Sequence, residues 1–106
     1  MIYVIATLQL KPGVRERVLR EVHAVSAEVR REDGCLEYTA NIDVESGHPR
    51  QIALRPDVLT IVERWRDLGA LAAHSSAPHM LAFRQRVAEL VLSTSLQILA
   101  PADSAS

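Results

Sequence analysis

The spacing of apolar residues alternates along this chain between the two-residue repeat of a strand and the 3.6-residue repeat of a helix. The order of these changes limits the folds it can adopt. Residues 2–10 alternate strictly, which predicts a strand with one apolar face. That face carries Ile2, Val4, Ala6, Leu8 and Leu10. Lys11-Pro12-Gly13 then breaks the strand, and Pro12 is placed to start a helix.

A stripe of five valines follows at helical spacing. It consists of Val14, Val18, Val22, Val25 and Val29. Valine lowers helix propensity because it is β-branched. The spacing is nevertheless that of one face of an amphipathic helix, which we expect Gly34 to end.

Two more strands are predicted in the middle of the chain. Residues 35–44 alternate again, with Leu36 and Tyr38 on the apolar face. Residues 45–57 are irregular and indicate a long hairpin loop, with a short extra strand suggested at 51–54. Residues 58–65 are apolar on both faces, which is typical of a central strand.

The last third of the chain predicts a broken helix and a final strand. Asp67 is a suitable N-cap for a short helix that runs to His74. Pro78 restarts the chain into a second helical piece. Its apolar stripe consists of Met80, Phe83, Val87, Leu90 and Val91. Residues 92–99 form the last strand, and residues 101–106 are expected to be a flexible tail.

The element order βαββαβ is that of a ferredoxin-like α+β domain, here residues 1–100, with helices on one face of an antiparallel sheet. The other sheet face would then be bare. We assign to it the apolar residues Tyr3, Ile5, Leu59, Ile61 and Trp65. An uncovered apolar face on so small a domain indicates a partner surface, and a second copy related by a two-fold axis is the simplest partner. We therefore expect a homodimer through the open sheet face.

Composition excludes several classes of function. The 106 residues carry a formal net charge of −1, which argues against nucleic acid or an anionic membrane as the main partner. No apolar run is long enough to span a bilayer. The first residues lack the basic region and cleavage site of a signal peptide. The single Cys35 cannot form an intramolecular disulfide. We expect a cytoplasmic domain of a bacterial cell.

Four short motifs on this βαββαβ chain resemble the antibiotic biosynthesis monooxygenase family, a branch of the dimeric α+β barrels. They are Gly34-Cys35-Leu36-Glu37-Tyr38, Glu63-Arg64-Trp65, Ala70-Leu71-Ala72-Ala73-His74 and Ser76-Ala77-Pro78-His79-Met80. The resemblance covers residues 1–99. It implies a dimer in which each subunit holds a pocket between its sheet and its helices.

The resemblance also implies chemistry. Some members of the family oxygenate hydroquinones or polyphenols with O₂ and without flavin, haem or metal. The physical reason is that an electron-rich phenolate can itself give an electron to oxygen. Such a protein needs a dry pocket and a group that deprotonates the substrate. Other members isomerise a small carbonyl compound, and a third alternative is a non-catalytic dimer that binds a hydrophobic ligand.

We predict His74 as the catalytic residue, because an imidazole gains and loses a proton near neutral pH. The competing interpretation is a structural histidine whose ring is hydrogen-bonded to backbone or to the dimer partner. Trp65 is predicted to wall an aromatic substrate, although core packing would explain it equally well. His79 and Glu63 are further candidates for substrate binding, against a capping role for His79 and an arginine pair for Glu63. No metal site is expected, since no third ligand accompanies the two histidines at a suitable spacing.

The chain departs from two branches of the family. The haem-degrading branch has an asparagine late in the first strand, where Ala6 and Thr7 stand here. The polyketide-tailoring oxygenases have an asparagine four residues before the tryptophan, where this chain has Ile61.

Overall fold

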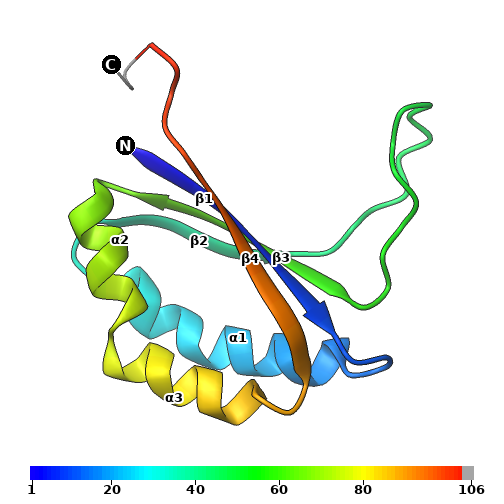
Figure 1. The fold of residues 1–106 in the computed structure, drawn as a ribbon, viewed down its shortest axis with the longest axis horizontal. Helices are drawn as coiled ribbons and strands as arrows, with labels where there is room; N and C mark the ends of the chain where they lie inside the picture. Colours follow the sequence, from blue (N-terminus) through cyan, green and yellow to red (C-terminus); the bar gives the residue numbers. More distant parts are fainter. Residues whose placement is uncertain (104–106) are drawn as a thin grey trace.

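The computed structural model describes residues 1–103, which form a four-stranded antiparallel sheet with three helices on one face (Figure 1). The elements are β1 (Ile2–Leu10), α1 (Arg15–Arg30), β2 (Cys35–Asn41), β3 (Val58–Trp65), α2 (Leu68–Ser75), α3 (Pro78–Val87) and β4 (Val91–Leu99). The strand order is β2-β3-β1-β4. This confirms the ferredoxin-like α+β arrangement, with its second helix split into α2 and α3.

The core lies between the sheet and the helices. The predicted apolar face of β1 is buried from Val4 to Leu10, and four of the five stripe valines of α1 are buried against the sheet. The helix begins at Arg15 and not at Pro12. Pro12 belongs to a turn in which Gly13 adopts a φ of 79° and donates its N–H to Asp57 Oδ1 at 3.0 Å.

The open face of the sheet differs from the prediction. Leu59, Ile61 and Trp65 point toward the helices and are buried, so their assignment to the open face was wrong. The pairing of Ala6 with Ile61 in the β1–β3 register puts these residues on the core face. A strand that is apolar on both sides gives no signal of which side faces the core. The central strands present instead a mixed, half-buried open face of Tyr3, Ile5, Thr7, Thr60, Val62 and Arg64.

A bulge changes the alternation of β2. Cys35 pairs with Trp65 and Glu37 pairs with Arg64, so Leu36 is an extra residue with no partner on β3. Leu36 is consequently 49% exposed, and Cys35 packs on the core in its place. The prediction of Leu36 on the core face was therefore wrong. The strand also ends at Asn41, three residues earlier than predicted.

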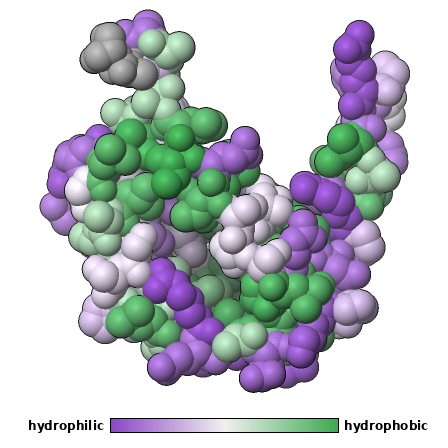
Figure 2. Space-filling view, viewed as in Figure 1, coloured by the Kyte–Doolittle hydropathy of each residue, from purple (hydrophilic) through white to green (hydrophobic). Residues whose placement is uncertain are grey.

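Residues 42–57 form an arm that projects away from the sheet (Figure 1). The suggested strand at 51–54 is absent from the described chain, where these residues have no regular structure. Arg55 closes the base of the arm by donating to both oxygens of Asp43 at 2.8 Å. The tip of the arm is mostly hydrophilic, with apolar residues nearer its base (Figure 2).

The turn from β3 into α2 fixes the position of His74. As predicted, Asp67 caps α2, and its Oδ1 accepts the N–H of Ala70 at 2.9 Å. Gly34 lies against the first turn of α2 and has a φ of 84°. A Cβ at this position would lie 2.6 Å from Ala70 Cβ, so only glycine fits here without a shift. α1 itself ends three residues before Gly34, at the C-cap Arg31. Gly34 thus shapes the turn into β2 rather than ending the helix directly.

The predicted domain bounds, 1–100 with a tail at 101–106, stay a prediction. Residues 101–103 follow β4 as a short turn, and the rest of the predicted tail, 104–106, lies outside the described residues. No helix within residues 1–103 has the length and apolar character needed to cross a membrane.

Candidate functional site

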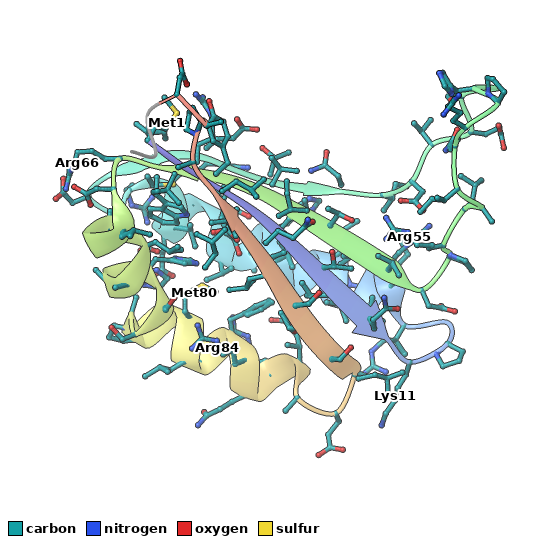
Figure 3. The ribbon with its side chains drawn as sticks, turned by 45° about the horizontal axis from the view of Figure 1, so that its top comes forward. Met1, Lys11, Arg55, Arg66, Met80 and Arg84 are labelled. Carbon is teal, nitrogen blue, oxygen red and sulfur yellow. The ribbon has the colours of Figure 1, made fainter. Side chains whose placement is uncertain are left out.

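A cavity of about 250 Å³ lies between the sheet and helices α2 and α3. Most of its lining is apolar, and it receives side chains from all four strands. The lining residues are Val4, Ala6, Leu8, Tyr38, Ile61, Glu63, Leu71, His74, Ser75, Met80, Phe83, Arg84, Thr94 and Leu96. Arg84 and Thr94 are exposed, so the cavity opens to solvent between α3 and β4. Figure 3 shows Met80 and Arg84 on α3, below β4.

His74 forms part of the polar wall of the cavity. It sits in the last turn of α2 and is buried. The Trp65 ring lies 4.6 Å from the imidazole at a tilt of 34°, and the Tyr38 ring meets it edge-on at 5.7 Å. His74 Nδ1 lies 2.9 Å from Glu32 Oε2, and Nε2 lies 4.0 Å from Glu63 Oε1. The ring is therefore held by two aromatic neighbours and by a carboxylate at one nitrogen.

Glu63 places a carboxyl group beside His74. It is buried on β3, and its Oε1 accepts the indole N–H of Trp65 at 2.9 Å. Burial raises the pKa of Glu63, and the nearby Glu32 adds to the rise, while the indole hydrogen bond and His74 oppose it. The predicted alternative of an arginine pair is not found among the described residues. The neighbouring Arg64 binds Glu37 instead, with Nε 2.8 Å from Oε1.

Trp65 and His79 are set back from the cavity. Trp65 is fully buried and is not part of the lining, so it packs against His74 and holds Glu63. His79 is also absent from the lining, and its Nε2 lies 2.7 Å from Glu32 Oε2. The structure thus brings His74 and Glu63 to the cavity wall. Trp65 contacts both of them from outside the lining, and His79 is linked to His74 through Glu32.

Three residues of the site were not singled out from the sequence. Glu32 bridges the two histidines, Tyr38 lines the cavity beside His74, and Arg84 stands at the opening. A signal for Glu32 was present, because it continues the valine stripe three residues after Val29. Burial and the charges of Glu63 and Glu32 raise the pKa of Tyr38, so its hydroxyl stays protonated and can donate a hydrogen bond.

The remaining polar candidates do not form a second centre. Burial, followed by the charges of Glu32 and Glu63, raises the pKa of Cys35, which disfavours the reactive thiolate. Within residues 1–103, no group of three or more histidine, cysteine, aspartate or glutamate side chains is arranged to hold a metal ion. Two other histidines, His23 and His48, are exposed and distant in sequence from the site motifs.

Comparisons with known proteins match nearly the whole chain. The sequence model of a family described as antibiotic biosynthesis monooxygenase matches residues 1–86. A protein of Escherichia coli K12 named "Probable quinol monooxygenase YgiN" is 33% identical over an alignment of 103 residues that covers 95% of this chain and 98% of YgiN. Rv0793 of Mycobacterium tuberculosis is 32% identical over 104 residues, or 97% of this chain and 93% of Rv0793.

Solved structures agree with the sequence comparisons. The structure of Rv0793 has a TM-score of 0.78 with this chain, covering 99% of it and 98% of Rv0793 at 30% identity. The crystal structure of PA3566 from Pseudomonas aeruginosa has a TM-score of 0.77 at 29% identity, covering 94% of this chain and 92% of PA3566. The likeness therefore includes every element that contributes to the cavity.

Proposed function

Because this chain belongs to the antibiotic biosynthesis monooxygenase family, we propose that it is a monooxygenase that oxidises a small quinol-like aromatic compound with O₂. The observation that carries this proposal is an imidazole and a carboxyl group set side by side in the wall of an otherwise apolar cavity. The cavity volume of about 250 Å³ is near the lower end of ligand sites, which suits one or two aromatic rings. The name of YgiN, a quinol monooxygenase, supports the same substrate class.

The proposed reaction balances with O₂ as the second substrate. A quinol and one O₂ give a hydroxyquinone and one water. One oxygen atom is inserted into a ring C–H bond and becomes a hydroxyl group, and the other leaves as water with two hydrogens. The quinol loses four electrons and O₂ gains them. A base must remove a hydroxyl proton at the start, and a proton must be returned when the water departs.

The residues at the cavity wall can perform these steps. His74 lines the cavity, and its Nε2 takes the hydroxyl proton, since Nδ1 is occupied by Glu32. The protonated Tyr38 hydroxyl donates a hydrogen bond to a substrate oxygen. Glu63, with its raised pKa, is a second site for a proton near the reacting ring. Trp65 holds His74 and Glu63 in place rather than touching the substrate.

We propose that no organic cofactor or metal takes part. The support is chemical, because a deprotonated quinol is electron-rich enough to reduce O₂ by itself, and most of the cavity lining is apolar. Oxygen uptake is then expected to be unchanged after metal depletion and in the presence of a chelator. A loss of uptake that added metal ions restore would contradict this part of the proposal.

The first experiment measures oxygen uptake by the purified protein over a panel of one-ring and two-ring hydroquinones. We expect uptake above the autoxidation rate and a fall of about 10²–10⁴-fold in His74→Ala, the usual contribution of a positioned base. His23→Ala is the matched control, because His23 is exposed on α1 and is expected to leave the rate unchanged.

The same protein samples separate the alternatives. Proton exchange beside a carbonyl group in oxygen-free buffer, without oxygen uptake, would indicate an isomerase that uses His74. Saturable binding of a hydroquinone with neither activity would indicate a binding protein. Uptake equal in wild type and His74→Ala would contradict the role given to His74.

We also propose that the protein is a homodimer through its open sheet face. The support is the half-buried centre of that face, with Tyr3, Ile5 and Val62 surrounded by polar residues. On the edge strand β4, the exposed Leu99 pairs with Tyr3 and extends this face, whereas the exposed Leu96 and Ile98 pair with Ala6 and Val4 on the core side. Figure 2 shows a hydrophobic patch over the C-terminal half of this strand, toward the upper left of the view.

A further inference from the structure

One carboxylate oxygen joins two histidines from different helices. Glu32 Oε2 lies 2.9 Å from His74 Nδ1 on α2 and 2.7 Å from His79 Nε2 on α3. The side chain of Glu32 is only 13% exposed, so water does little to screen these contacts. An ionised carboxylate can only accept hydrogen bonds, so each of these ring nitrogens carries a proton. The geometry therefore fixes the tautomer of His74, with Nε2 left free to accept a proton when the ring is neutral.

The two histidines contact different surroundings beyond Glu32. His74 lines the cavity, and its Nε2 is 4.0 Å from Glu63 Oε1. His79 lies toward solvent, and its Nδ1 is 3.7 Å from Oε2 of Glu28, whose side chain is 54% exposed. A row of polar groups thus runs from the cavity to the surface, with Glu32 at its centre.

The carboxylates around His79 accommodate a positive charge better than the surroundings of His74 do. His79 has one carboxylate at each ring nitrogen, Glu32 and Glu28, and both favour the imidazolium form. The N-terminus of α3 opposes this charge, but a direct hydrogen bond to a carboxylate is the stronger effect. His74 is more deeply buried, and its second carboxyl neighbour, Glu63, has a raised pKa. One negative charge at Glu32 is therefore shared by two rings, of which the outer one is the better place for a cation.

We propose that Glu32 and His79 are positioning residues that let His74 exchange protons with its substrate at constant charge. This inference rests on the proposed function, in which His74 takes a proton from a quinol. When His74 Nε2 gains the hydroxyl proton, His79 Nδ1 releases one proton to solvent. When His74 returns a proton to the departing water, His79 takes one up. Both hydrogen bonds to Glu32 persist throughout, and neither ring changes its tautomer.

Other titratable and charged residues lie around Glu32 and the two histidines and contribute to the electrostatic potential there. Glu63 approaches from β3, Tyr38 and Cys35 from β2, Arg84 from α3 and Glu28 from α1. None of them bridges the two rings as Glu32 does within residues 1–103. The test therefore changes Glu32 and His79 and leaves the others in place.

The experiment compares Glu32→Gln and His79→Gln in two measurements. The first is the rate of oxygen uptake with a hydroquinone from pH 5 to pH 9. His79→Gln removes a neighbouring cation, so the acid limb of the profile is expected to move to higher pH. Glu32→Gln removes the shared anion, so the acid limb is expected to move to lower pH, with a lower plateau. We expect each shift to be about one pH unit, or about tenfold in rate on the acid limb.

The second measurement is the ¹⁵N NMR titration of the histidine rings in the protein without substrate. It is independent of activity. We expect His74 as the Nδ1–H tautomer in wild type, loss of that preference in Glu32→Gln, and opposite shifts of its titration midpoint in the two variants. His23→Gln is the matched control and should move neither the profile nor the midpoint.

The outcomes separate this inference from the proposed function. A purely structural role would lower the rate at all pH values without moving the limb, and would overturn the inference. Midpoints that move in the same direction in both variants, or not at all, would also overturn it. Absence of oxygen uptake in the wild type would overturn the proposed function, whereas opposite midpoint shifts in the NMR titration would still support the coupling of the two rings.

Discussion

Glu63 keeps a carboxyl group inside the fold without an arginine beside it. Its hydrogen-bond donor is the indole of Trp65, and burial is the main reason for its raised pKa. A buried carboxyl of this kind costs stability when it ionises. Its retention at the cavity wall agrees with a role in chemistry, because stability alone would favour a neutral residue there.

The raised pKa of Glu63 predicts how stability depends on pH. Between the usual pKa of a glutamate and the raised value, the folded protein holds a proton that the unfolded chain has released. The free energy of unfolding therefore falls as the pH rises through this range. Glu63→Gln keeps an oxygen for the Trp65 indole and removes the titration. We expect the variant to be more stable than wild type at pH 8 and about equal to it at pH 4.

Urea unfolding followed by the fluorescence of Trp65, the single tryptophan, measures this difference. Glu37→Gln is the control, because Glu37 is half-exposed and paired with Arg64. Such a pair contributes about 0–1 kcal/mol. A Glu63→Gln variant that is less stable than wild type at pH 8 would contradict the expected sign.

At the scale of single residues, part of the candidate site could be predicted from the sequence. His74 and Glu63 could be proposed because their residue types suit proton transfer and their motifs resemble a family. Glu32 was missed because it lies in a charged run, Arg30 to Asp33, that resembles a solvated helix end. Only the fold brings the two histidine-bearing helices to it, over 42 and 47 residues of chain.

At the scale of elements, the turn between α1 and β2 and the start of α2 depend on each other. Gly34 has a positive φ and touches the first turn of α2, which carries His74 at its other end. The position of the imidazole therefore depends on a backbone contact at the far end of its helix.

Gly34→Ala is expected to be more destabilising than a glycine substitution at another positive-φ position. An alanine at φ 84° costs about 1–2 kcal/mol. Overpacking against Ala70 adds about 1–3 kcal/mol. Gly47→Ala is the matched control, since Gly47 has a φ of 75° with nothing within 4 Å of the added Cβ. Thermal or urea unfolding of both variants gives the comparison.

A second substitution isolates the contact. Ala70→Gly removes the clashing methyl, so the double variant with Gly34→Ala should lose less stability than the sum of the two single variants. Strict additivity would show that the backbone angle alone accounts for the loss.

The elements themselves were largely predictable, because alternation and the valine stripe are strong local signals. The wrong predictions of which side chains face the core were decided by pairing between strands. The core-facing side of β3 follows from its register with β1, and the exposure of Leu36 follows from a bulge against β3. The sequence of β3 is apolar on both sides, so it does not indicate which side faces the core. The sequence of β2 keeps alternating through the bulge, so it does not indicate that Leu36 is exposed.

At the scale of the whole molecule, the open sheet face is the surface that predicts assembly. We expect a sedimentation mass of twice the 11.7 kDa of one chain at micromolar concentration. Val62→Glu places a charge at the centre of this face and is expected to give the single-chain mass. Leu81→Glu is the control, because Leu81 is an exposed apolar residue on α3, on the opposite side of the sheet. A wild-type protein with the single-chain mass would contradict the dimer.

The pairing of β1 has a consequence for the kinetics of folding. Ile5 pairs with Val62 on one side and with Gln97 on the other, so this central strand waits for partners that lie far along the chain. Closing such long loops is slow. Before β3 and β4 pair with β1, α1 is the only neighbouring element in sequence that can cover the apolar side of β1. That side supplies the floor of the cavity through Val4, Ala6 and Leu8. The cavity therefore exists only after both late strands have docked, and during refolding the capacity to bind a ligand should return last, after helix content and the fluorescence of the core.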